Sequence, residues 1–117
     1  MSQLFERIDT VFLQVKTLDE AIPWYQENLG FELRWRQGGH ACMNVAETPL
    51  TLWETPSGEA HTPHPYLAFN FYIKDLEACE RHLQERGVQT EPILDHGVVK
   101  TLDFFDNSGN RLSVCSW

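Results

Sequence analysis

The chain has few basic residues and no long hydrophobic segment. Its 117 residues hold 9 Lys and Arg against 17 Asp and Glu, for a formal net charge of −8 at pH 7. An acidic surface repels phosphate backbones and anionic lipids, so neither nucleic acid nor a membrane is expected as a partner. No apolar run is long enough to span a bilayer, and residues 1–7 lack the basic and then apolar order of a secretion signal. We therefore expect a cytoplasmic protein.

Cysteine is also scarce, and no metal-binding spacing is present. Cys42, Cys79 and Cys115 are odd in number and none forms a CxxC pair, which favours free thiols over a disulfide framework or a zinc knuckle. His61 and His64 lie among prolines in a segment typical of a solvated loop. A metal site built from His40 and Glu54 stays open as an alternative, although nothing in the spacing requires it.

The chain does contain a repeat. Residues 8–31 and 66–88 each begin with alternating apolar residues and change to helical spacing at the same place. Aligning the copies superposes identical residues: Lys16 with Lys74, Leu18 with Leu76, Gln26 with Gln84, Glu27 with Glu85 and, after one deletion, Gly30 with Gly87. Two copies of one supersecondary unit are predicted.

Each copy is expected to form a strand, a helix and three further strands. In the first half these are residues 9–16, a helix from the N-cap Thr17 to about residue 29, and strands 31–36, 40–46 and 50–54. In the second half they are residues 66–74, the helix 76–86, and strands 89–94, 98–105 and 111–116.

The predicted fold class is α+β, with two tandem βαβββ modules in a single domain. Module 1 covers about residues 7–54, a linker rich in proline covers 55–65, and module 2 covers about 66–117. One helix on the outer face of each module and a curved mixed sheet around a concave pocket are expected, because neither half could bury its own sheet.

Three segments resemble the vicinal oxygen chelate superfamily: the strand IDTVFLQV, the helix LDEAIPWYQENLGF and the closing DFFDNSGNRLSV. That superfamily includes glyoxalase I, fosfomycin-resistance and bleomycin-resistance proteins and extradiol dioxygenases. The resemblance covers about residues 7–117. It implies the tandem fold, a homodimer and, for catalytic members, a divalent metal on the concave face.

The resemblance also places the metal ligands of the catalytic members on this sequence. They fall on Thr10, Ala68, Ser113 and Thr51, or on Trp53 in place of Thr51 if the register shifts by two residues. None of these side chains is an imidazole or a carboxylate. We therefore predict no metal cofactor, and keep a divalent metal ion bound by relocated ligands as the alternative.

Strand alternation predicts which side chains line the pocket. Aromatic rings to stack a planar ligand and amides to orient it are typical of small-molecule sites. The predicted ligand-binding residues are Phe12, Gln14, Thr51, Trp53, Tyr66, Asn70, Tyr72 and Ser113. Arg34 and Arg36 are predicted to share a strand face opposite Phe31, Leu33 and Trp35. There they are solvated or pair with acids or, alternatively, bind a substrate carboxylate.

The predicted function is binding or sequestration of a small molecule by a glyoxalase-like or bleomycin-resistance-like protein. No catalytic residue is assigned, and enzymatic activity stays open. One alternative is a metal-dependent lyase or dioxygenase-type enzyme of the same superfamily. The second is a dimeric interaction module whose concave face is filled.

Overall fold

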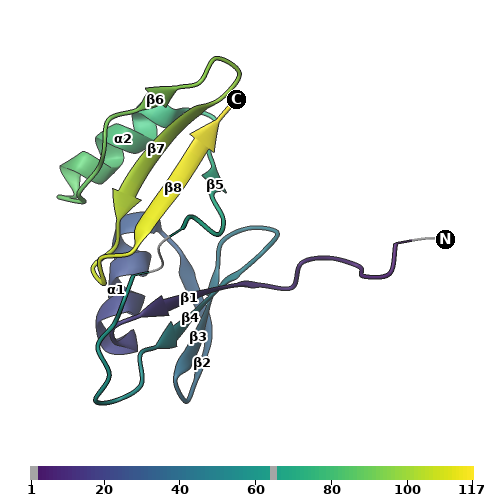
Figure 1. The fold of residues 1–117 in the computed structure, drawn as a ribbon, viewed down its shortest axis with the longest axis vertical. Helices are drawn as coiled ribbons and strands as arrows, with labels where there is room; N and C mark the ends of the chain where they lie inside the picture. The colour runs from purple at the N-terminus through teal and green to yellow at the C-terminus, as the bar shows by residue number, and fades with distance from the viewer. Residues whose placement is uncertain (1–2, 64–65) are drawn as a thin grey trace. The chain divides into compact units, whose positions relative to one another are not determined.

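Each half of the chain folds as a four-stranded mixed sheet with one helix, as the repeat predicts. The computed structural model describes residues 3–63 and 66–117, so positions 64–65 of the predicted linker, including His64, lie outside the described residues. The chain divides into two compact units, Met1–His61 and Thr62–Trp117, which Figure 1 draws in purple to teal and in teal to yellow. Neither helix in the described ranges has the length and hydrophobicity to cross a bilayer.

The first unit contains sheet 1 and the helix α1. Its elements are β1 (Val11–Val15), α1 (Leu18–Leu29), β2 (Glu32–Gln37), β3 (His40–Asn44) and β4 (Leu50–Glu54). The strand order is β1-β4-β3-β2, in which β1 runs parallel to β4 and the other neighbours are antiparallel. The predicted order of a strand, a helix and three strands is confirmed.

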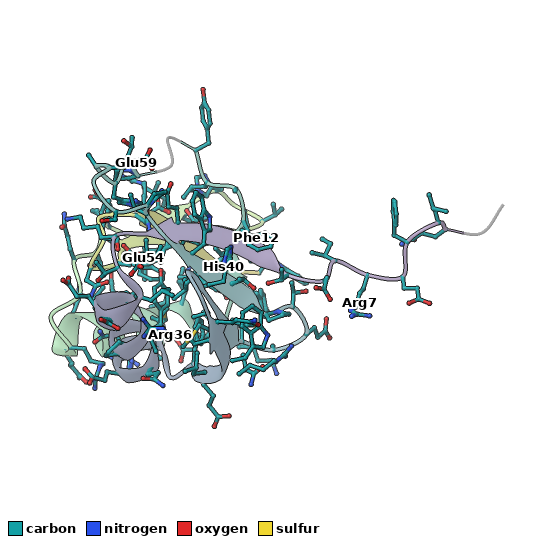
Figure 2. The ribbon with its side chains drawn as sticks, turned by 90° about the horizontal axis from the view of Figure 1, so that it is seen from below. Arg7, Phe12, Arg36, His40, Glu54 and Glu59 are labelled. Atoms are coloured by element: carbon teal, nitrogen blue, oxygen red, sulfur yellow. The ribbon has the colours of Figure 1, made fainter. Side chains whose placement is uncertain are left out.

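Helix α1 begins and ends where its capping residues require. Thr17 Oγ1 accepts a hydrogen bond from the Glu20 amide at 3.3 Å, and the Glu54 carboxylate accepts one from the Leu18 amide at 2.8 Å. Gly30 ends the helix at φ 73°, where its amide bonds to the Gln26 carbonyl. Glu54 is therefore a cap of the helix, and its place near α1 can be followed in Figure 2.

One face of sheet 1 is apolar and covered by α1. The helix buries Leu18, Ala21, Ile22 and Tyr25. The sheet contributes Leu13, Val15, Ala41, Met43, Leu50 and Leu52, all of which are buried. Because successive side chains of a strand point to opposite faces, the residues between these form the other face, which we call the helix-distal face.

The second unit repeats this topology with shorter outer strands. Its elements are β5 (Phe71–Tyr72), α2 (Leu76–Glu85), β6 (Leu94–Asp95), β7 (Lys100–Phe105) and β8 (Arg111–Ser116), with strand order β5-β8-β7-β6. Asp75 caps α2 by accepting a hydrogen bond from the Ala78 amide at 3.0 Å. The buried Leu102, Phe104, Leu112 and Val114 line the face towards α2.

Two predicted strands of the second unit are much shorter in the structure. Of residues 66–74 only Phe71–Tyr72 forms a strand, paired with Val114 and Cys115. Of residues 89–94 only the last joins the strand Leu94–Asp95, while Thr90 makes an isolated bridge to Phe104. Alternation therefore does not determine which way Tyr66, Ala68 and Asn70 point.

A β-bulge in β2 overturns the predicted arginine pair. The register between β2 and β3 shifts between Leu33 and Trp35, so Arg34 is the extra residue of the bulge. Arg36 NH1 lies 2.9 Å from Asp19 Oδ1 of α1, whereas Arg34 Nε donates to Asn44 Oδ1 at 2.6 Å. The two arginines do not share a face. Trp35 pairs with Cys42 and joins the helix-distal face.

Candidate ligand-binding site

The helix-distal face of sheet 1 presents aromatic side chains beside polar ones. Strand register places Phe12 opposite Thr51, and Gln14 and His40 each opposite Trp53, so these side chains share one face. Phe12 is 60% exposed and Trp35, brought there by the bulge, is 44% exposed. Figure 2 shows Phe12 and His40 on their strands, β1 and β3. Four of the predicted site residues, Phe12, Gln14, Thr51 and Trp53, thus lie together.

A hydrogen-bond chain orients Gln14 on this face. Thr55 Oγ1 donates its single hydrogen to the Val15 carbonyl at 2.8 Å. It must therefore accept from Gln14 Nε2 at 3.1 Å and from His61 Nδ1 at 3.2 Å. The Gln14 amide consequently directs its nitrogen to Thr55, and His61 carries a hydrogen on Nδ1. His61 lies in a loop, as predicted, but it is half-buried and bonded to a buried threonine, so it is less solvated than expected.

The predicted residues of the second unit fall into two groups. Tyr72 and Ser113 lie on paired strands, and Ser113 is buried opposite Asp103. The Tyr72 hydroxyl donates to the Trp117 carbonyl at 3.3 Å, and the two rings lie 5.0 Å apart between centroids. Tyr66 and Asn70 are exposed and precede β5, outside any strand.

Two hollows are lined by residues other than those predicted to bind the ligand. One, of about 250 Å³, lies in the second unit and is lined by Glu91, Pro92, Leu94, Thr101, Asp103 and Arg111. The other, of about 340 Å³, lies in the first unit and is lined by Lys16, Thr17, Thr55, Pro56, Ser57, Gly58, Glu59 and His61. None of the lining residues belongs to the predicted ligand-binding set, and those of the first unit lie in loops, where no strand alternation applies.

A family model for the Glyoxalase/Bleomycin resistance protein/Dioxygenase superfamily matches residues 7–114, which is most of the chain. The chain belongs to this superfamily. The resemblance seen in the sequence is therefore confirmed. No curated protein sequence matches the chain.

Several solved structures share the fold over nearly the full length. A glyoxalase family protein from Enterococcus faecalis is 21% identical with a TM-score of 0.80, covering 97% of this chain and 100% of that one. TnmS3, an antibiotic binding protein from Streptomyces sp. CB03234, is 22% identical with a TM-score of 0.80, covering 97% of each chain. Lactoylglutathione lyase from Agrobacterium tumefaciens is 16% identical with a TM-score of 0.77, covering 97% of this chain and 96% of that one.

The positions that the superfamily resemblance assigns to metal ligands do not fit a divalent cation here. Thr10 Oγ1 donates to the Pro49 carbonyl at 2.9 Å and lies 2.8 Å from Thr51 Oγ1, so it accepts from the Thr51 hydroxyl, and both hydroxyls have partners within the protein. Ala68 has no donor atom, and Ser113 offers only a buried neutral hydroxyl. No mechanistic step is therefore assigned to a metal.

The alternative metal-binding pair, His40 with Glu54, does not fit a metal site either, because the two side chains have different surroundings. His40 pairs with Trp53 on the helix-distal face, whereas Glu54 is bonded to the amino end of α1. Within residues 3–63 and 66–117 no group of three His, Cys, Asp or Glu side chains is placed to hold a metal ion. Cys79 lies on α2, where burial raises the pKa of its thiol and disfavours the thiolate.

Proposed function

We propose that this chain binds a small, partly aromatic molecule on the helix-distal face of sheet 1, in the cytoplasm and without the metal of the catalytic relatives. The observation that carries the proposal is the aromatic set of the exposed Phe12 and Trp35 and the half-buried Trp53, beside the oriented amide of Gln14. Large apolar side chains left exposed together on one face of a sheet mark a contact site for another molecule.

The chemistry of this face favours a planar ligand with a polar group. Aromatic rings stack on planar ligands and contribute about 0.5–1.5 kcal/mol per pair beyond the area that they bury. Gln14 contributes direction, because its nitrogen is already bonded to Thr55. In the second unit we propose Tyr66, Asn70, Tyr72 and Ser113 as further ligand-binding residues, with Trp117 added because its ring contacts Tyr72.

The comparisons support binding without naming the ligand. One similar structure is described as an antibiotic binding protein and another as a lyase. At these identities the likeness concerns the fold, so the argument depends on the residues of sheet 1. We also propose that the chain forms a homodimer, as the superfamily resemblance implies. The exposed apolar residues Leu4, Phe5 and Ile8 of the segment before β1 support a partner surface.

Titration of the ¹⁵N-labelled protein with the planar neutral probe 2-naphthalenemethanol tests the binding proposal. The indole N–H resonances of Trp35 and Trp53 should shift saturably, and Phe12→Ala should weaken binding roughly fivefold, the loss expected for one aromatic contact. Val98→Ala is the control, because it truncates another exposed apolar side chain, outside sheet 1 and outside the segment assigned to the dimer surface. Equal effects of both variants, or shifts that spare both indoles, would refute the proposal.

A further inference from the structure

The sheet of the second unit, β5-β8-β7-β6, is called sheet 2. The hollow in this unit lies on the side of sheet 2 that faces away from α2, and we call it the sheet-2 hollow. Thr101 and Asp103 alternate along β7 with Leu102 and Phe104, which are buried on the side of α2. Arg111 pairs with Phe105 at the start of β8 and belongs to the same face as Asp103. Glu91, Pro92 and Leu94 complete the lining. The volume of about 250 Å³ suits a small molecule or one group of a larger one.

The positive charge in this hollow is already compensated. Arg111 Nε donates to Asp103 Oδ2 at 2.8 Å, and the guanidinium lies over the Phe105 ring, 5.3 Å from its centroid. The Asp103 side chain is only 18% exposed. An anionic ligand would have to displace this shielded carboxylate from Arg111, so the guanidinium is poorly available to a ligand.

The second carboxylate of the hollow, that of Glu91, is paired with Arg111 less closely than the Asp103 carboxylate is. Glu91 Oε1 lies 3.7 Å from Arg111 NH1, which is too long for a hydrogen bond, and its side chain is 43% exposed. Two carboxylates and one guanidinium leave one net negative charge in the hollow. Beside that charge stand the apolar surfaces of Pro92 and Leu94, and Leu94 is 56% exposed.

We infer that the sheet-2 hollow binds a small amphipathic organic cation, whose protonated amine bonds to Glu91 while its apolar part contacts Leu94 and Pro92. The inference goes beyond the proposed function, because it adds a cation site in the second unit with lining residues of its own. The net charge of −8 of the whole chain acts in the same direction by attracting cations at low ionic strength. Glu91, Leu94 and Asp103 were not among the residues predicted to bind the ligand.

Three probes of similar shape test the charge preference: 2-phenylethylamine, which is an ammonium at pH 7, the neutral 2-phenylethanol and the anion phenylacetate. With ¹⁵N-labelled protein in 20 mM salt, the ammonium should shift the amides of Glu91, Thr101 and Asp103. It should bind at least fivefold more tightly than the alcohol, and phenylacetate should not bind. Raising the salt to 500 mM should lower the affinity for the ammonium but not the affinity for the alcohol, because salt screens exposed charge pairs.

Glu91→Gln is the deciding variant, and Glu85→Gln is its matched control on the exposed side of α2. Both remove one negative charge from the second unit, but only the first should lower the affinity for the ammonium, by roughly fivefold as for one partly exposed ion pair. Neither should change the affinity for the alcohol. An alcohol that binds as tightly as the ammonium, or equal losses in both variants, would overturn the inference.

The two failures can be told apart. In the first case the ammonium shifts none of the amide resonances of Glu91, Thr101 and Asp103, while 2-naphthalenemethanol still shifts the indole resonances of Trp35 and Trp53. The inferred cation site is then wrong and the proposed function stands. If the naphthalene probe fails, the proposed function is wrong, and saturable shifts at Glu91 and Thr101 with the ammonium would then identify a cation site of its own.

Discussion

At the scale of single residues, Thr55 links the candidate site to the sheet. It is buried, it donates to the carbonyl of the fully buried Val15, and it accepts from Gln14 and His61. One hydroxyl therefore joins the end of β1, a binding-face amide and a loop histidine. Nothing in the pattern of the sequence marks this role, because Thr55 is the first residue of a segment that reads as a linker.

The Thr55 hydroxyl can be tested with two variants. Thr55→Val keeps the shape and the bond from the Thr55 amide to the Val15 carbonyl at 2.9 Å, but removes the hydroxyl. Unfolding in urea should show a loss of about 0.5–1.5 kcal/mol, the usual net contribution of one hydrogen bond. Thr55→Ser keeps the hydroxyl and should lose less. If the two variants were equally stable, the hydrogen bonds of Thr55 would not contribute to stability.

Alternation predicted some residues of the site well and others poorly. Phe12, Gln14 and Trp53 were predicted correctly to share a face, because β1 and β4 are regular and paired without a break. Trp35 was placed on the wrong face because a bulge reverses the side chains that follow it, and no residue type marks a bulge without its partner strand. Glu54 was considered as a metal ligand, but its carboxylate caps a helix 36 positions earlier in the chain.

At the scale of elements, the two copies of the repeat differ most in their first strands. β1 pairs with β4 over five residues, whereas β5 pairs with β8 over only two. The segment 66–74 has the aromatic and branched residues of a strand, but strand propensity depends on a partner being present. The sequence therefore predicts the kind of element and overestimates its length.

Amide hydrogen exchange measures this difference directly. The amides of β1 that bond to β4 should exchange at least tenfold more slowly than those of Ala68 and Asn70, which lie outside any strand. Ile73, whose amide donates to the Cys115 carbonyl at 3.0 Å, should behave like β1 and is the internal reference in the second unit. Equal protection of Ala68 and Leu13 would mean that the strand extends in solution as the repeat predicts.

At the scale of the whole molecule, the repeat was sufficient to predict the fold class. Periodicity and capping residues define the order of a strand, a helix and three strands in each half, and the structure confirms that order twice. The identity of the ligand cannot be predicted from periodicity and capping residues. It depends on side chains that meet only when the strands pair, such as Gln14 with Thr55 and Arg111 with Asp103.

The proposed homodimer gives a prediction for the whole chain. With a mass of 13.6 kDa, the protein should sediment at twice this mass at micromolar concentration. Replacing Phe5 and Ile8 by Ser should favour the monomer, because both side chains are exposed and apolar and would lose buried area. Val98→Ser, at another exposed apolar residue, is the control. A wild-type chain that sediments as a monomer would refute the dimer.

The Thr10 and Thr51 hydroxyls have a consequence for any attempt to convert this protein into a metalloenzyme. The Thr10 hydroxyl donates to the Pro49 carbonyl, so the Thr51 hydroxyl donates to Thr10 at 2.8 Å. Thr51 is almost fully buried, so a larger His or Glu side chain would overpack position 51, whereas Thr10 is only half-buried. Introducing a cation ligand by laboratory evolution should therefore cost more stability at position 51 than at position 10.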